Sequence, residues 1–184
     1  MKRTTILLGS ALAAVALAGG VSSGLNKGED VTPFHPSHFA GPLANTTNCF
    51  PCTFQNRPQV QVWVNGDSLP NVAKIAKSLS AAMKENQKAE FKALVVFVAE
   101  GAQAESIKNY GVALSKRDGF SGIAMATISP KDASIKNYKI NLSPEVKNTV
   151  LVYRNWKVQD KLVNLTSDEK GLKTLEASIQ SVVK

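Results

Sequence analysis

The chain has 184 residues, a formal net charge of +8 and 43% hydrophobic residues. This length suits one domain with a complete core. The lysines are scattered rather than clustered, which argues against a nucleic-acid-binding surface. The sequence also lacks a glycine-rich phosphate loop and a G-x-S-x-G nucleophile motif. We therefore expect no nucleic-acid partner, no phosphate-loop nucleotide chemistry and no serine-hydrolase chemistry.

The first residues have the pattern of a cleavable export signal. Lys2 and Arg3 are followed by an apolar run over 6–18, which ends in the small-x-small pattern Ala-Leu-Ala. The run has roughly 13 residues, too few to cross a bilayer as a helix. We predict a signal peptide over 1–18, with cleavage after it or as late as Ser23. The mature protein is then exported to the periplasm or the extracellular space, without stable membrane insertion.

Residues 19–48 are predicted to form an extended arm ahead of the domain. The segment is rich in Gly, Pro and Asn and shows no apolar period, and loops of this length are uncommon unless they are functional or disordered. It contains both histidines of the protein, His35 and His38, and it leads directly into the cysteines. The domain itself is predicted to cover 49–184.

Strand and helix patterns alternate through the rest of the chain. Strands are predicted over 58–64, 93–99 and 123–128, helices over 70–83 and 107–114, a hairpin of strands over 149–153 and 161–165, and a last helix to 182. The last helix is predicted to open with the capping box Thr166-x-x-Glu169. This order predicts an α/β fold, a three-layer α/β/α sandwich with a mostly parallel sheet and a C-terminal antiparallel hairpin.

The motif Cys49-Phe-Pro-Cys52 holds the only two cysteines of the chain. An exported protein meets an oxidising compartment, so this pair can form a disulfide. The spacing lets the two sulfurs meet within one tight turn and change between dithiol and disulfide with little backbone movement. We expect Cys49, which is nearer the open arm, to be the attacking thiol and Cys52 to be the resolving thiol.

This element order, the export signal and the C-x-P-C motif together resemble the thioredoxin-like superfamily, and in particular its exported TlpA-like and peroxiredoxin-like branches. The segment 123–132 is similar to the third strand of that family and the polar turn after it, and 138–158 is similar to the segment that leads into its hairpin. The resemblance implies a thioredoxin-like fold and thiol–disulfide exchange. It also implies protein thiols or disulfides as partners and no cofactor.

Two positions depart from the family pattern. In the family the cysteine pair follows a central strand and opens a helix. The corresponding junction here, after Ala99, has no cysteine, and the pair lies before the first predicted strand. The cis-proline that faces the disulfide in the family is matched here by Asn148. The resemblance therefore implies a displaced cysteine pair.

Two alternatives to redox exchange remain open on the residues alone. His35-x-x-His38 together with Cys49 and Cys52 makes four ligands of the types that zinc and copper favour. A structural disulfide without catalysis is the second alternative. In the chain-entropy model a four-residue loop gains only about 2 kcal/mol from closure, which is a weak reason to keep this spacing.

Overall fold

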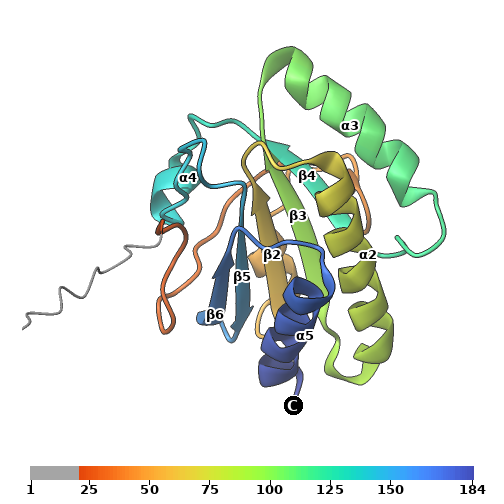
Figure 1. The fold of residues 1–184 in the computed structure, drawn as a ribbon, viewed down its shortest axis with the longest axis vertical. Coiled ribbons are helices and arrows are strands. Elements are labelled where there is room, and N and C mark those ends of the chain that lie inside the picture. Colours follow the sequence, from red (N-terminus) through yellow and green to blue (C-terminus); the bar gives the residue numbers. More distant parts are fainter. Residues whose placement is uncertain (1–20) are drawn as a thin grey trace, which may run out of the picture.

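A computed structural model describes residues 21–184 of the chain, and the predicted signal peptide over 1–18 lies outside the described residues. Within 21–184, no helix is long and apolar enough to cross a membrane. Six strands form one sheet in the order β1-β4-β3-β2-β5-β6 (Figure 1). These strands are β1 (Ser37–Ala40), β2 (Gln59–Val64), β3 (Lys92–Val98), β4 (Ala124–Ile128), β5 (Asn148–Arg154) and β6 (Lys157–Val163).

The centre of the sheet is parallel and its C-terminal part is antiparallel. β3 runs parallel to both β2 and β4, whereas β5 pairs antiparallel with β2, and β6 pairs antiparallel with β5. The β5–β6 hairpin turns at Asn155 and Trp156, which both have positive φ values, 51° and 66°. The predicted α/β architecture, with a parallel core and a terminal hairpin, is therefore confirmed.

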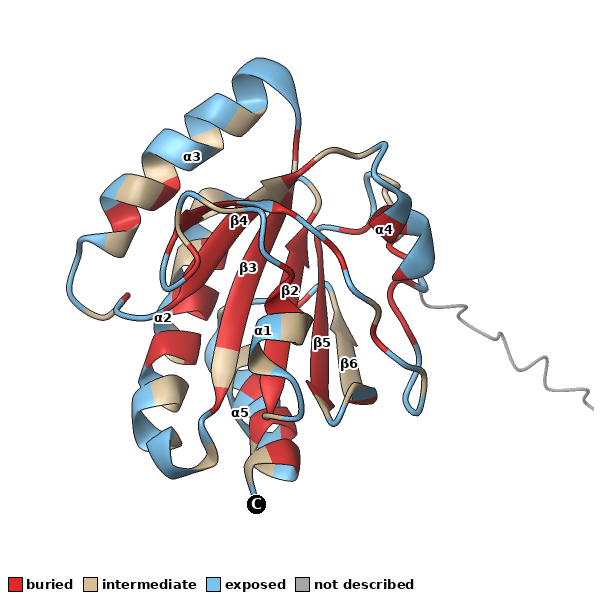
Figure 2. Cartoon of the chain, turned by 180° about the vertical axis from the view of Figure 1, so that it is seen from behind, coloured by how far each residue is buried: buried red, intermediate tan, exposed pale blue. Residues whose placement is uncertain are grey.

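Helices cover both faces of the sheet (Figure 2). One face, which we call the helical face, is closed by α2 (Leu69–Glu85), α3 (Gly101–Ser115) and α5 (Glu169–Val183). The other, which we call the arm face, is closed by the short helices α1 (Phe50–Phe54) and α4 (Ala133–Asn137) and by residues 21–36. A 3₁₀ turn, Gln87–Ala89, lies between α2 and β3.

Strand β2 shows how the sequence divides between the two faces. Successive side chains of a strand point to opposite sides, so Val60 and Val62 join the core of the helical face while Trp63 joins the core of the arm face. All six residues of β2 are buried. The polar Gln59 and Gln61 therefore lie inside the protein.

The last helix begins two residues later than a capping box at Thr166 requires, so that prediction is wrong. Asp168 is the N-cap of α5, and its Oδ1 accepts a hydrogen bond from the backbone N–H of Gly171 at 2.7 Å. Aspartate caps helix N-termini as well as threonine does or better. Glu169, the first helical residue, instead pairs with Lys173 one turn later, with a closest N–O distance of 2.7 Å.

The arm contributes to the domain core, which its sequence pattern did not predict. β1 pairs antiparallel with β4 and forms an edge of the sheet. Leu25, Val31 and Phe34 are buried in the core of the arm face. Gly24 has a φ of +83°, and a Cβ atom there would lie 2.6 Å from the Thr149 side chain. The arm therefore lies close against β5, in contacts that an apolar period does not reveal.

Candidate functional site

Cys49 and Cys52 are joined by a disulfide, with their Cα atoms 5.2 Å apart. Cys49 is the N-cap of α1, and Pro51 lies in the first turn, where the missing N–H of proline costs no hydrogen bond. The Sγ atom of Cys49 accepts a hydrogen bond from the backbone N–H of Cys52 at 3.2 Å. Cys52 lies inside the five-residue helix α1, and β2 begins at Gln59, so the pair precedes this strand as the sequence indicated.

The two cysteines differ in exposure. Cys49 is 6% exposed, whereas Cys52 is half-buried. Phe50 is 1% exposed and joins the core of the arm face, so it anchors α1 to the sheet. We expected Cys49 to be the attacking thiol. The exposure of the two residues favours the opposite order, with Cys52 meeting an incoming reagent first.

The two histidines lie beside the segment that leads into Cys49. His35 is exposed, and its Nδ1 donates to the backbone carbonyl of Thr47 at 3.0 Å. His38 is 4% exposed, and its Nε2 donates to the backbone carbonyl of Asn48 at 3.0 Å. Burial lowers the pKa of His38, and the hydrogen bond to Asn48 opposes that effect. The neutral imidazole is therefore favoured.

The predicted zinc or copper ligands do not come together as a metal site. Within 21–184, no group of three or more His, Cys, Asp and Glu side chains is arranged to hold a metal ion. The histidines instead contact backbone carbonyls, and Cys49 and Cys52 are bonded to each other. The metal-binding alternative thus gains no geometric support.

Comparison with known proteins identifies the fold. No protein-family model matches the sequence, and no curated protein matches it either. Solved structures do match. A candidate thiol:disulfide interchange protein, DsbE, from Chlorobium tepidum gives a TM-score of 0.62 at 14% identity, covering 87% of this chain and 99% of its own. The chain has a thioredoxin-like fold.

Two further solved structures are similar to the chain over most of its length. An uncharacterized conserved protein from Geobacillus kaustophilus gives a TM-score of 0.65 at 8% identity, covering 89% of this chain and 85% of its own. The peroxidoxin BcpB from Mycobacterium tuberculosis gives a TM-score of 0.56 at 15% identity, and the match covers 82% of this chain and 96% of BcpB. At these identities the likeness establishes the fold, and the chemistry must be argued from the site itself.

In the thioredoxin-like family, the cysteine pair and the cis-proline occupy positions that correspond here to the junction after Ala99 and to Asn148. Both positions are held by polar contacts in this structure. At the start of α3, the Glu100 carboxylate pairs with Lys131 at 3.0 Å, and the hydrogen bond from Lys131 is the main cause of its lowered pKa. Asn148 is 1% exposed and donates to the Asp67 carboxylate at 2.6 Å and to the Leu165 carbonyl at 2.9 Å. Neither position carries a cysteine or a proline, so Cys49 and Cys52 are the redox candidates.

A buried polar network under α1 was missed by the sequence analysis. The Trp63 indole N–H donates to Gln61, the Gln61 amide donates to the Tyr153 hydroxyl, and that hydroxyl donates to Gln59, over distances of 2.7–3.1 Å. The Gln59 amide then donates to the carbonyl of Gln55, the C-cap residue of α1, at 2.8 Å. Burial raises the pKa of Tyr153. Two glutamines within an apolar strand were the available signal.

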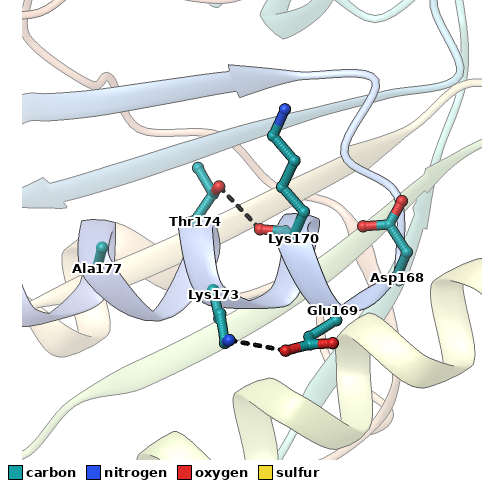
Figure 3. Close-up of a pocket in the computed structure, with 6 residues that line it drawn as sticks. All are labelled: Asp168, Glu169, Lys170, Lys173, Thr174 and Ala177. Carbon is teal, nitrogen blue, oxygen red and sulfur yellow. Dashed lines mark hydrogen bonds and ion pairs between the residues drawn. The ribbon is translucent and has the colours of Figure 1, made fainter.

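Two surface hollows lie away from the disulfide, whereas a third includes His38 and Asn48 in its lining. One hollow, on α5, is lined by Asp168, Glu169, Lys170, Lys173, Thr174 and Ala177 (Figure 3). Its charged side chains face solvent, and two of them form the Glu169–Lys173 pair. A second, of about 240 Å³, lies where β2 and β3 end, beside Val64 and Phe97. Ligands commonly bind at such strand ends in open α/β sheets, but neither hollow is lined by a cysteine or histidine.

Proposed function

We propose that this chain is an exported thioredoxin-like protein that carries out thiol–disulfide exchange through Cys49 and Cys52. The observation that carries the proposal is a disulfide closed within one helical turn, with one cysteine half-buried and therefore within reach of a partner. Similar folds among proteins described as a thiol:disulfide interchange protein and a peroxidoxin add support. The expected partners are protein thiols or disulfides.

The exposure of the two cysteines suggests the order of the reaction. A substrate thiolate attacks the Cys52 sulfur, forming a mixed disulfide and releasing Cys49 as a thiolate. The N–H of Cys52, 3.2 Å from the Cys49 sulfur, is in position to stabilise that leaving thiolate. A second substrate thiolate then attacks the substrate sulfur of the mixed disulfide and releases the Cys52 thiolate. Two electrons pass from the substrate dithiol to the pair, and the reverse sequence oxidises the pair's dithiol.

Export is the second part of the proposal, and the signal pattern over 1–18 supports it. Ser23 bears on the cleavage position, because its side chain is 1% exposed and hydrogen-bonds to the Thr149 hydroxyl at 2.6 Å. Its Oγ also accepts from the backbone N–H of Asn141 at 3.0 Å. Cleavage after Ala18 keeps these contacts, whereas cleavage at 23 disturbs them. N-terminal sequencing of the exported protein should therefore find Gly19 first.

The decisive test combines a reduction potential with turnover. The purified protein is equilibrated with glutathione buffers, and its reduction of a disulfide-bonded protein such as insulin is followed. A potential between about −270 and −120 mV, the range of known exchange proteins, is expected. Cys52→Ser and Cys49→Ser should each reduce the exchange rate at least about a hundredfold, because either change removes one of the two thiols that together donate two electrons to the substrate disulfide. Unchanged turnover in both variants would refute the proposal.

A non-catalytic structural disulfide is the second candidate, and the burial of Cys49 and Phe50 favours it. In that case α1 serves as a staple between the arm and β2. A potential below about −300 mV, together with no measurable turnover, is typical of a structural bond. That outcome would replace exchange with the structural function.

A further inference from the structure

Both histidines of the protein hold the main chain immediately before the first cysteine. His35 donates to the carbonyl of Thr47, and His38 donates to the carbonyl of Asn48, each at 3.0 Å. These carbonyls belong to the two residues that precede Cys49. The two histidines of the pattern His35-x-x-His38, which the sequence suggested as metal ligands, therefore bind backbone carbonyls in the structure.

Backbone hydrogen bonds hold the same segment, residues 45–48, which we call the cysteine strap. The N–H of His38 donates to the carbonyl of Thr46 at 2.9 Å, and the N–H of Asn45 donates to the carbonyl of His38 at 2.9 Å. His38 thus contacts the strap through its main chain and its side chain. Because His38 also belongs to β1, paired with Ala126 of β4, the strap is tied to the edge of the sheet.

Cys49 is held from its other side as well. Its backbone carbonyl accepts from the N–H of Thr53 at 3.0 Å and from the hydroxyl of Thr53 at 2.9 Å. The strap fixes the chain before Cys49, and α1 fixes the chain after it. The direction of the Cys49 side chain toward Cys52 therefore depends on both.

The burial of His38 indicates that its bond to the strap matters. The side chain is almost fully enclosed, and among the described residues no group hydrogen-bonds its Nδ1 atom. A buried polar atom without a partner destabilises a protein. A phenyl ring would occupy a similar volume without that penalty. What the imidazole adds is the hydrogen bond from Nε2 to the carbonyl of Asn48.

We propose that His38 is a positioning residue for the Cys49–Cys52 pair, with His35 as a weaker second contact. The inference rests on the proposed function, since it describes how that redox pair is tuned. By fixing the strap, the imidazole keeps the two sulfurs facing each other when the pair is reduced, and this raises their effective concentration for disulfide closure. Loosening the strap favours the dithiol and raises the reduction potential.

The test is the equilibrium constant of the pair against glutathione in the full protein. His38→Phe keeps the ring volume and removes the donor, and it should shift the constant about tenfold toward the dithiol, which is about 30 mV for a two-electron couple. His38→Gln restores an N–H donor and should recover most of that shift. His35→Ala, at an exposed site, should shift the constant about twofold. Ile179→Val, on the helical face, is the control for a general loss of stability and should leave the constant unchanged.

The outcomes separate this proposal from the proposed function. A wild-type constant in His38→Phe overturns the positioning role, and so does an equal shift in Ile179→Val. If His38→Phe does not fold, His35→Ala decides, and an unchanged constant there overturns the role. Turnover of the wild-type protein is measured separately. An inert wild-type pair would refute exchange, while its equilibrium constant would still respond to the strap.

Discussion

The two faces of the sheet are closed in different ways. The helical face is covered by three helices of 15 to 17 residues, which bury a stripe of aliphatic side chains such as Ile75, Leu79 and Leu175. The arm face is covered by two five-residue helices and irregular chain. It is the arm face that carries the disulfide and a buried network of glutamine, tryptophan and tyrosine side chains.

This difference shows which face of such a fold can accommodate reactive side chains. A long amphipathic helix commits its inward stripe to packing, so its buried positions have little room for reactive groups. Irregular chain must instead satisfy its backbone groups one by one, and side chains such as His35 and His38 do so here. The same contacts bring polar side chains next to Cys49. The predictions below test this contrast, from the largest expected effect to the smallest.

The largest effect is expected from truncating one buried anchor on each face. Phe50→Ala on the arm face and Leu175→Ala on the helical face should each lower the free energy of unfolding by about 2–5 kcal/mol, because both side chains are almost fully buried. Only Phe50→Ala should also shift the reduction potential, because α1 carries both cysteines. Urea unfolding and glutathione equilibration measure the two quantities. An equal shift in potential for Leu175→Ala would break the contrast between the faces.

The polar network of the arm face should show strong coupling. Gln61→Leu leaves the Trp63 N–H without its acceptor and should lower the free energy of unfolding by about 1–3 kcal/mol. Tyr153→Phe removes the hydroxyl that links Gln61 to Gln59. The double variant should be less destabilised than the sum of the two single variants, by 0.5 kcal/mol or more, roughly the lower limit for residues in contact. Strict additivity in urea unfolding would mean that the network has no cooperative role.

On the helical face, the corrected helix cap gives a smaller effect. Asp168→Ala should lower the free energy of unfolding by about 1 kcal/mol, because the N–H of Gly171 loses its acceptor. Asp168→Asn keeps an acceptor oxygen and serves as the matched control. Neither variant should change the reduction potential. If Thr166→Ala lowered the free energy of unfolding more than Asp168→Ala did, the result would support the predicted capping box at Thr166.

The smallest expected effect is the loss of folding stability at acidic pH. Burial lowers the pKa of His38 in the folded state, so the unfolded chain binds a proton more readily below the ordinary histidine pKa of about 6.5. Stability from this residue is complete above that pH and is lost as pH falls below it. The hydrogen bond to Asn48 opposes the shift and keeps the effect small.

Urea midpoints between pH 5 and pH 7 provide the measurement for His38. The wild-type midpoint should fall at the lower pH, and His38→Phe should remove that part of the fall. His35→Gln, which removes the exposed imidazole instead, is the matched control and should keep the wild-type pH dependence. A fall of equal size in His38→Phe and wild type would assign the acid sensitivity to other groups.

Local patterns were sufficient to predict the regular elements and the geometry of the cysteine turn. The period-2 run of β2, the continuous apolar run of β3 and the helical stripe of α2 depend on neighbouring residues, as does the four-residue motif from Cys49 to Cys52. The alternation of these elements, together with the family resemblance, also predicted the parallel core and the terminal hairpin. Such features are determined by the sequence itself because nearby residues decide them.

The placement of the arm was decided only by the tertiary structure. The Tyr138 hydroxyl donates to the carbonyl of Thr32, 106 positions away, and Ser23 bonds to Thr149, 126 positions away. Contacts at such separations leave no local period in the sequence. For the same reason, the sequence alone suggested a metal ligand set in His35 and His38, whereas the folded chain turns both imidazoles to the backbone that presents Cys49.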